Sequence, residues 1–182
     1  MKRCASLRLL LTFLLLATLA AQGERRYDPL DKDEINQLRD AMLDPDERLK
    51  LYVSFARDRI TKLEQMRADP KTTDRAQKTH DLLQDFLSIY DELNDNVDMY
   101  VGRKDDIRKP LKLVIEADIE FQSKLRALKD AANAGAAESK QYEFLLSNAI
   151  ETVDSSADDH RGTVTEVEEY VKRKKKTSKD AK

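Results

Sequence analysis

The stretch AQKTHDLLQDFLSIYDELNDNVDMY, residues 76–100, decides the fold of this chain. Its apolar or small side chains recur at alternating intervals of three and four residues, which places them on one face of an α-helix. This heptad seam is typical of helices that pack nearly antiparallel or supercoil around each other. The residues of the seam are Ala76, Thr79, Leu83, Phe86, Tyr90, Leu93, Val97 and Tyr100. The stretch therefore predicts one long helix of a bundle, and Gly102 is expected to end it.

A second long helix is predicted directly upstream, from residue 45 to residue 68. Asp44 is suited to accept hydrogen bonds from the free backbone N–H groups at its start, and Pro45 loses no hydrogen bond at the first helical position. Asp69 ends the helix because it precedes Pro70, and a residue before proline avoids helical angles. The apolar face of this helix consists of Leu49, Tyr52, Val53, Ala56, Ile60 and Leu63.

Two more long helices are predicted downstream of the seam. One begins near Asp106 and ends at the Asn-Ala-Gly sequence of residues 133–135. The other begins near Ala137 and keeps an apolar face as far as Val171. Two serines and a glycine within residues 155–162 weaken this last helix, so a bend or a short break is expected there.

Together these segments predict an all-α protein, an elongated antiparallel up-down bundle of four long helices with a short N-terminal helix. Short connections between the helices indicate antiparallel neighbours. Low glycine and proline content and the absence of tryptophan also favour helices. We expect a signal peptide at residues 1–21, a lead at 22–44, the bundle at 45–171 and a basic, disordered tail at 172–182. The short helix of the lead is marked by Ile35, Leu38 and Met42.

The first 21 residues have the layout of a secretory signal peptide. A basic start, from Lys2, Arg3 and Arg8, precedes an apolar run at residues 9–16, and cleavage is expected after Ala20 or Ala21. The apolar run is shorter than the roughly 18–20 residues that span a bilayer, so no transmembrane segment is expected in the mature chain. The expected localisation is therefore the periplasm or the cell exterior, depending on the envelope of the source cell.

The mature chain is acidic. Without residues 1–21 it holds 30 Lys and Arg against 35 Asp and Glu, a net charge of −5, which argues against a nucleic-acid partner. The sole cysteine, Cys4, lies in the removed part, so the mature fold is expected to rely on packing without disulfides. The oligomeric state is not indicated.

No catalytic, cofactor or metal residue is predicted. The four glycines are scattered singly, so a glycine-rich phosphate loop is missing, and no nucleophile elbow occurs. Di-iron bundles use Glu-x-x-His pairs, but Gln77 lies three residues before His80 and Ala157 three residues before His160. A di-metal oxidase or ferritin-like carrier is thus only a third possibility, and an enzyme is not expected.

One polar residue lies on an apolar helical face. Asp118 falls near the middle of the arc formed by its apolar neighbours, and Asn94 has the same place on the preceding helix. Folding the hairpins brings both residues, and Arg48, to one level. Asp118 is therefore predicted in the bundle interior, within salt-bridge reach of Arg48 or hydrogen-bond reach of Asn94. The three form a candidate buried polar layer that either sets helix register or lines a ligand site inside the bundle. His160 is expected to be exposed or to cap a helix at the bend.

The end of the chain is strongly basic. Residues 172–182 carry seven positive charges and one negative charge, which leaves residues 22–171 with a net charge of −11. One interpretation is a solubilising helix end. The other is electrostatic adhesion to an anionic surface or an acidic envelope protein. The candidate contact residues are Lys172, Arg173, Lys174, Lys175 and Lys176.

Residues 44–68 contain two short motifs, a D-P-x-x-R start in Asp44-Pro45-Asp46-Glu47-Arg48 and an A-x-x-R-[LI] continuation from Ala56 to Ile60. In these motifs the segment resembles the opening helix of a bacterial family of helical extracytoplasmic domains of unknown function. The resemblance implies an exported helical domain and no known activity. No functional residue follows from it.

The sequence thus predicts an exported, non-enzymatic helical bundle that acts as a structural or interaction module. The alternative is a periplasmic chaperone, or a stress or metal sensor, of the helical type. An exposed apolar concavity would favour the chaperone and a closed bundle would count against it.

Overall fold

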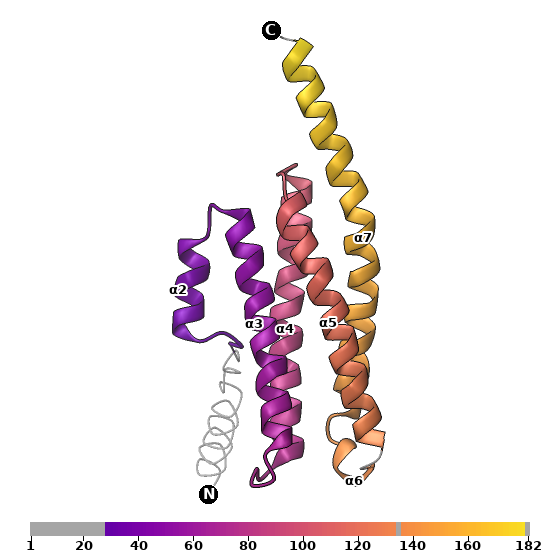
Figure 1. Cartoon of the computed structure of the whole chain (residues 1–182). Helices are drawn as coiled ribbons and strands as arrows, with labels where there is room; N and C mark the ends of the chain where they lie inside the picture. Colours follow the sequence, from indigo (N-terminus) through magenta and orange to yellow (C-terminus); the bar gives the residue numbers. More distant parts are fainter. Residues whose placement is uncertain (1–27, 134–135, 181–182) are drawn as a thin grey trace, which may run out of the picture.

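A computed structural model describes residues 28–133 and 136–180, and every regular element in these ranges is a helix (Figure 1). The predicted signal peptide at residues 1–21 lies outside the described residues. The helices are α2 (Lys32–Asp40), α3 (Pro45–Ala68), α4 (Arg75–Gly102), α5 (Arg108–Asn133), α6 (Ala136–Ser139) and α7 (Glu143–Asp180). The predicted all-α bundle of four long helices with a short N-terminal helix is confirmed.

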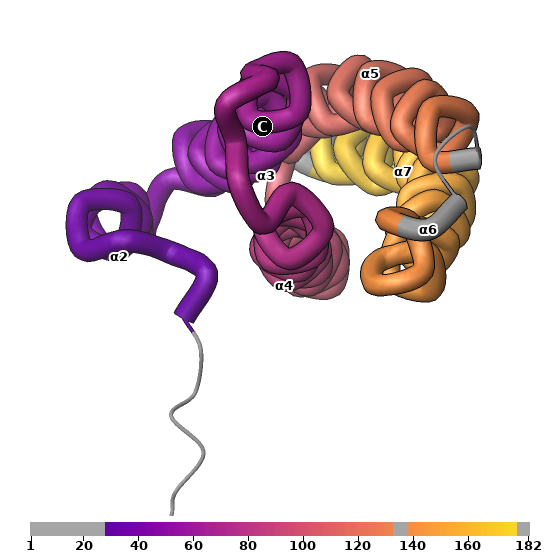
Figure 2. Tube along the Cα trace, turned by 90° about the horizontal axis from the view of Figure 1, so that it is seen from below, coloured from indigo at the N-terminus to yellow at the C-terminus, as the bar shows by residue number. Residues whose placement is uncertain are grey.

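The four long helices form two antiparallel hairpins that pack side by side. Helix α3 packs on α4 and on α5, and α7 packs on α5 and on α4, as the view along the bundle shows (Figure 2). Helices α4 and α5 therefore face each other across the core, although only a short turn joins them. The expectation that short connections make antiparallel neighbours is wrong for this pair, and α3 and α5 are parallel neighbours instead.

The core is built on the seam of α4. All of the predicted seam residues except Ala76 are buried. Phe86 stacks on Tyr90 with ring centroids 5.6 Å apart, and Phe121 of α5 meets both rings edge-on at 5.2 and 6.0 Å. Each such ring removes a large apolar surface from water and adds favourable edge contacts, so this cluster anchors the centre of the bundle.

Helix α3 begins with the side-chain cap that its sequence predicts, whereas α4 begins without one. The Asp44 side chain accepts a hydrogen bond from the backbone N–H of Glu47 at 3.1 Å, and Pro45 occupies the first turn. Asp74 precedes α4 in the left-handed conformation, with φ of 53°, and makes no side-chain capping bond. The start of α4 is therefore fixed by its packing rather than by its cap.

Helix α7 is one continuous helix, so the break predicted within residues 155–162 does not occur. Nothing lies within 4 Å of the position that a Cβ atom would take on Gly162, which faces open space. The prediction of a disordered tail at residues 172–182 is also wrong as far as residue 180, because α7 extends to Asp180. Salt bridges of Glu168 with Lys172 and of Glu169 with Arg173, each one turn apart, support the helix there.

Helix α2 packs against the outer side of α3 (Figure 2). Its N-terminus is a capping box, in which Asp31 accepts from the backbone of Glu34 and Glu34 accepts from the backbone of Asp31. Arg59 of α3 donates to Glu34 at 2.7 Å and to the Pro29 carbonyl oxygen at 2.7 Å. Since Arg59 and Glu34 are both buried, this ion pair fixes α2 against the bundle.

Candidate functional site

Asp118 lies in the interior of the bundle, as predicted, and its carboxylate joins three helices. The hydroxyl of Tyr90 on α4 donates to Oδ1 at 2.7 Å, and Nδ1 of His160 on α7 lies 2.9 Å from Oδ2. All three side chains are buried. A buried carboxylate needs such partners because an isolated charge in the core is strongly disfavoured.

The polar layer continues toward the surface through Ser156. The Asn94 side chain donates to the Ser156 hydroxyl oxygen at 2.9 Å, and Ser156 also hydrogen-bonds with Tyr90. Asn94 thus belongs to the same polar layer as Asp118, but the predicted direct contact between the two is replaced by the chain through Ser156 and Tyr90. Neither Tyr90 nor Ser156 was among the predicted layer residues.

Arg48 does not reach the layer, so its predicted salt bridge with Asp118 is wrong. Its guanidinium group donates to the Asn96 side chain, the Leu38 carbonyl oxygen and the Tyr52 hydroxyl at 2.8, 2.8 and 3.1 Å. The position of Arg48 around the helix axis was compatible with a contact to Asp118 and also with a contact to α2. Its position near the start of α3 brings it to α2, whose placement the sequence does not specify.

His160 is buried, which corrects the prediction of an exposed or capping histidine. The prediction assumed that the face is interrupted at a bend, but α7 is continuous, and its buried face runs from Val153 and Ala157 through His160 to Val167. This regular spacing was the signal that placed His160 in the core opposite Asp118. A partner for the aspartate could have been found by extending the face.

The electrostatics of the layer keep the Tyr90 proton in place. Burial raises the pKa of Tyr90 above its ordinary value, and the negative charge of Asp118 and the hydrogen bond to it raise it further. Tyr90 is therefore a hydrogen-bond donor throughout the physiological range. The layer thus joins α4, α5 and α7 through buried polar contacts.

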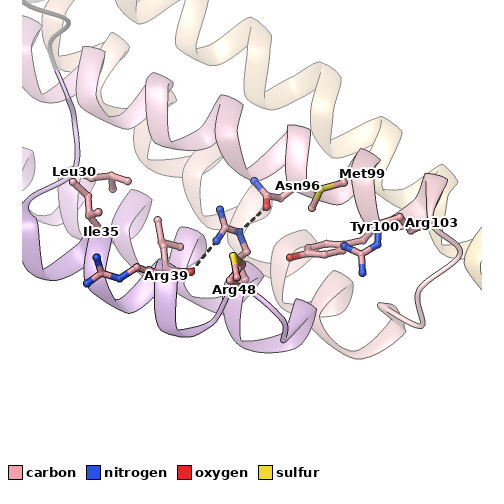
Figure 3. Close-up of a pocket in the computed structure, with 10 residues that line it drawn as sticks. Leu30, Ile35, Arg39, Arg48, Asn96, Met99, Tyr100 and Arg103 are labelled. Carbon is pink, nitrogen blue, oxygen red and sulfur yellow. Dashed lines mark hydrogen bonds between the residues drawn. The ribbon is translucent and has the colours of Figure 1, made fainter.

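A pocket of about 620 Å³ opens between α2, the start of α3 and the end of α4 (Figure 3). Its apolar wall exposes Ile35, Met42 and Met99, with 39%, 60% and 44% of their surface accessible. Arg48 and Tyr100 form its inner polar wall. A ligand in this pocket would contact both apolar and polar groups of the protein.

The basic end of α7 is a second candidate contact site. The helix projects past the turn between α4 and α5 (Figure 1). Tyr170 donates to the carbonyl oxygen of Asp105, and Val171 is the last buried residue of the described α7 side chains. Beyond it, Lys172, Arg173, Lys174, Lys175 and Lys176 are all exposed.

Within residues 28–133 and 136–180, no cluster of three or more His, Cys, Asp or Glu side chains has the geometry to hold a metal ion. In the same residues, no helix has the length and hydropathy to cross a bilayer.

Comparison of the chain with protein-family models, with curated proteins and with solved structures gave no match. The resemblance of residues 44–68 to an extracytoplasmic helical family therefore stays a prediction.

Proposed function

We propose that the protein is exported and acts, without catalysis, as a helical-bundle interaction module that contacts an anionic surface through the basic end of α7. An acidic envelope protein would present the same charge. The observation that carries the proposal is the continuation of α7 beyond the buried core as an exposed basic helix. The contact residues are Lys172, Arg173, Lys174, Lys175 and Lys176.

The acidic body of the protein opposes contact with an anionic surface, and the extension of α7 beyond the core reduces this repulsion. Residues 22–171 carry a net charge of −11, which repels the body of the protein from an anionic surface. From Val171 to Lys176, the last contact residue, the helix rises by about 7.5 Å, at 1.5 Å per residue. Exposed charges more than about 8–10 Å apart are largely screened at physiological ionic strength. The far end of the contact segment therefore lies about one screening length beyond the last buried residue, so part of the repulsion from the body is screened.

Vesicles in which one third of the lipid is anionic phospholipid test this contact. Basic residues near such a surface contribute about 1 kcal/mol each, so the intact protein should sediment with the vesicles at 0.1 M salt. It should dissociate as salt approaches 1 M, where the screening length falls to about 3 Å. Replacement of the five contact residues by glutamine should abolish sedimentation and preserve the helix.

A control with the same charge change replaces five exposed lysines of the body by glutamine, namely Lys71, Lys78, Lys112, Lys129 and Lys140. This variant should sediment as the unmodified protein does, or slightly less because of its added net negative charge. Equal vesicle binding by the α7 variant and the unmodified protein would contradict the proposal.

Export is tested separately by fractionating the source cells. The proposal predicts a mature chain that begins at Ala21 or Gln22, in the periplasm or the medium. Its N-terminal sequence gives the cleavage point directly. An uncleaved chain that accumulates in the cytosol would contradict export, whatever the vesicles show.

A second candidate function is that of a periplasmic chaperone, because the pocket beneath α2 exposes apolar side chains, Met42 foremost. The closed four-helix core counts against a large client surface. A chaperone should suppress aggregation of a chemically unfolded client protein, and Met42→Glu should reduce that suppression. A lack of suppression at equimolar protein would eliminate this candidate.

A further inference from the structure

The pocket between α2, the start of α3 and the end of α4 combines an apolar wall with a buried hydroxyl group that has no partner within the described protein. Tyr100 is 1% exposed, and its hydroxyl oxygen makes no hydrogen bond within the described protein. Tyr100 and Arg48 both line the pocket, and in Figure 3 the hydroxyl end of the Tyr100 ring points toward the side on which Arg48 lies. A buried polar atom without a partner costs roughly 1–3 kcal/mol, so an acceptor supplied by a ligand would relieve that cost.

Arg48 gives the pocket a positive charge. Its three hydrogen bonds go to neutral acceptors, and among the ion pairs of the described residues none involves Arg48. The guanidinium has five N–H donors, so donors remain for a further acceptor. A half-buried cation without a carboxylate partner favours an anionic ligand.

The charged groups around Tyr100 produce a positive electrostatic potential, which favours an anion. Burial raises the pKa of Tyr100, so the hydroxyl keeps its proton and is a donor. The charges of Arg48 and Arg103 lower that pKa, and each acts more strongly than the carboxylates of Asp105 and Asp44. Arg103 also lies over the Tyr100 ring at 5.5 Å. The polar end of the pocket is thus a donor in a positive field.

The opposite wall suits a flexible hydrocarbon. Ile35 and Met42 come from α2 and the residues after it, and Met99 comes from α4. Methionine side chains adapt to ligands of varied shape. The buried pair of Arg59 and Glu34 holds α2 in place, so the wall is preformed. The pocket volume of about 620 Å³ lies within the range typical of small-molecule sites.

We propose that this pocket binds a single-chain anionic amphiphile, a fatty acid, with its carboxylate on the Tyr100 hydroxyl and Arg48. The hydrocarbon chain lies against Ile35, Met42 and Met99. The proposal requires only the folded chain and depends neither on export nor on the basic end of α7. A neutral apolar peptide would use the wall but would leave the hydroxyl and the cation without an anion.

Calorimetric titration of the full chain with dodecanoate, below its micellar concentration, tests the site. Dodecyltrimethylammonium supplies the chain with the opposite charge, and acetate supplies the carboxylate without the chain. Dodecanoate should bind at least tenfold more tightly than either probe. Equal affinity for dodecanoate and dodecyltrimethylammonium would overturn the proposal, as would tight binding of acetate alone or of an uncharged apolar peptide in place of dodecanoate.

Two variants locate the site. Tyr100→Phe removes only a hydroxyl that has no partner, so the fold should be kept while dodecanoate affinity falls about tenfold, as expected for a hydrogen bond to a charged group. Met42→Glu should abolish binding by repulsion. The matched controls are Tyr142→Phe, a buried tyrosine outside the pocket, and Phe144→Glu, an exposed apolar residue outside it. Unchanged affinity in both pocket variants would overturn the assignment.

Discussion

At the scale of single residues, Asp118 shows how one carboxylate selects an arrangement of helices. Its two oxygens receive separate partners, Tyr90 from α4 and His160 from α7, while the residue itself belongs to α5. A shift of any of these helices by one turn, about 5.4 Å, would break at least one contact and leave a polar group buried without a partner. The layer therefore favours one register among otherwise similar apolar packings.

Asp118→Ala should destabilise the protein by about 3 kcal/mol, because it leaves the Tyr90 hydroxyl and the His160 ring without their acceptor inside the core. Asp118→Asn keeps the volume and one acceptor oxygen, so its cost should be smaller. Chemical denaturation followed by circular dichroism measures both. Asp159→Ala on the exposed side of α7 is the control and should change stability by less than about 0.5 kcal/mol. A loss below 1 kcal/mol for Asp118→Ala would show that the layer does not stabilise the fold.

At the scale of elements, the turn after α4 shows a local conflict between residue type and conformation. The N–H of Asp105 bonds to the carbonyl of Tyr100 and the N–H of Lys104 to that of Val101, the two bonds of a Schellman motif. Glycine usually fills the left-handed position of this motif, but here Lys104 does so, with φ of 59°. Gly102, which the sequence correctly predicts as the end of the helix, lies two residues earlier in helical conformation.

Lys104→Gly should therefore stabilise the protein by about 1 kcal/mol, because a side chain costs about that much in the left-handed region. Gly162→Ala should give a similar gain for the opposite reason, since it sits inside helix α7 with open space for the added Cβ. Thermal and chemical unfolding of both variants measure the gains. A destabilised Lys104→Gly would mean that the lysine side chain makes a contact that outweighs its backbone cost.

At the scale of the whole molecule, the helices and their faces were predictable because periodicity is a local property of the sequence. The seam of α4, except Ala76, and the face of α3 are buried. The sequence did not specify which hairpins become neighbours, because packing α3 beside α5 depends on contacts between distant segments. The interior position of Asp118 was predictable from its helical phase, and His160 could have been found by extending the face of α7, whereas the predicted level of Arg48 was wrong. The pocket was not predictable, because it depends on the docking of α2 through Arg59 and Glu34.

The buried tyrosines make the stability of the whole bundle sensitive to alkali. Burial raises the pKa of Tyr52, Tyr90 and Tyr100, and partial burial raises that of Tyr170, above the ordinary value of 10.0. Below pH 10 the folded and unfolded chains both hold these protons, and the contribution to stability is complete. Above pH 10 the unfolded chain releases protons that the folded chain keeps, so unfolding becomes more favourable as pH rises.

For a fully buried phenol such as Tyr90, the free energy of unfolding should fall by about 1.4 kcal/mol for each pH unit above 10, until the folded chain also ionises. Absorbance at 295 nm should therefore show the buried tyrosines ionising only as the helical signal disappears. Tyr90→Phe should reduce the slope of stability against pH by about one proton, although its lost bond to Asp118 lowers stability at neutral pH. Complete ionisation of the tyrosines near pH 10, with the helical signal retained, would contradict the buried positions of Tyr52, Tyr90 and Tyr100.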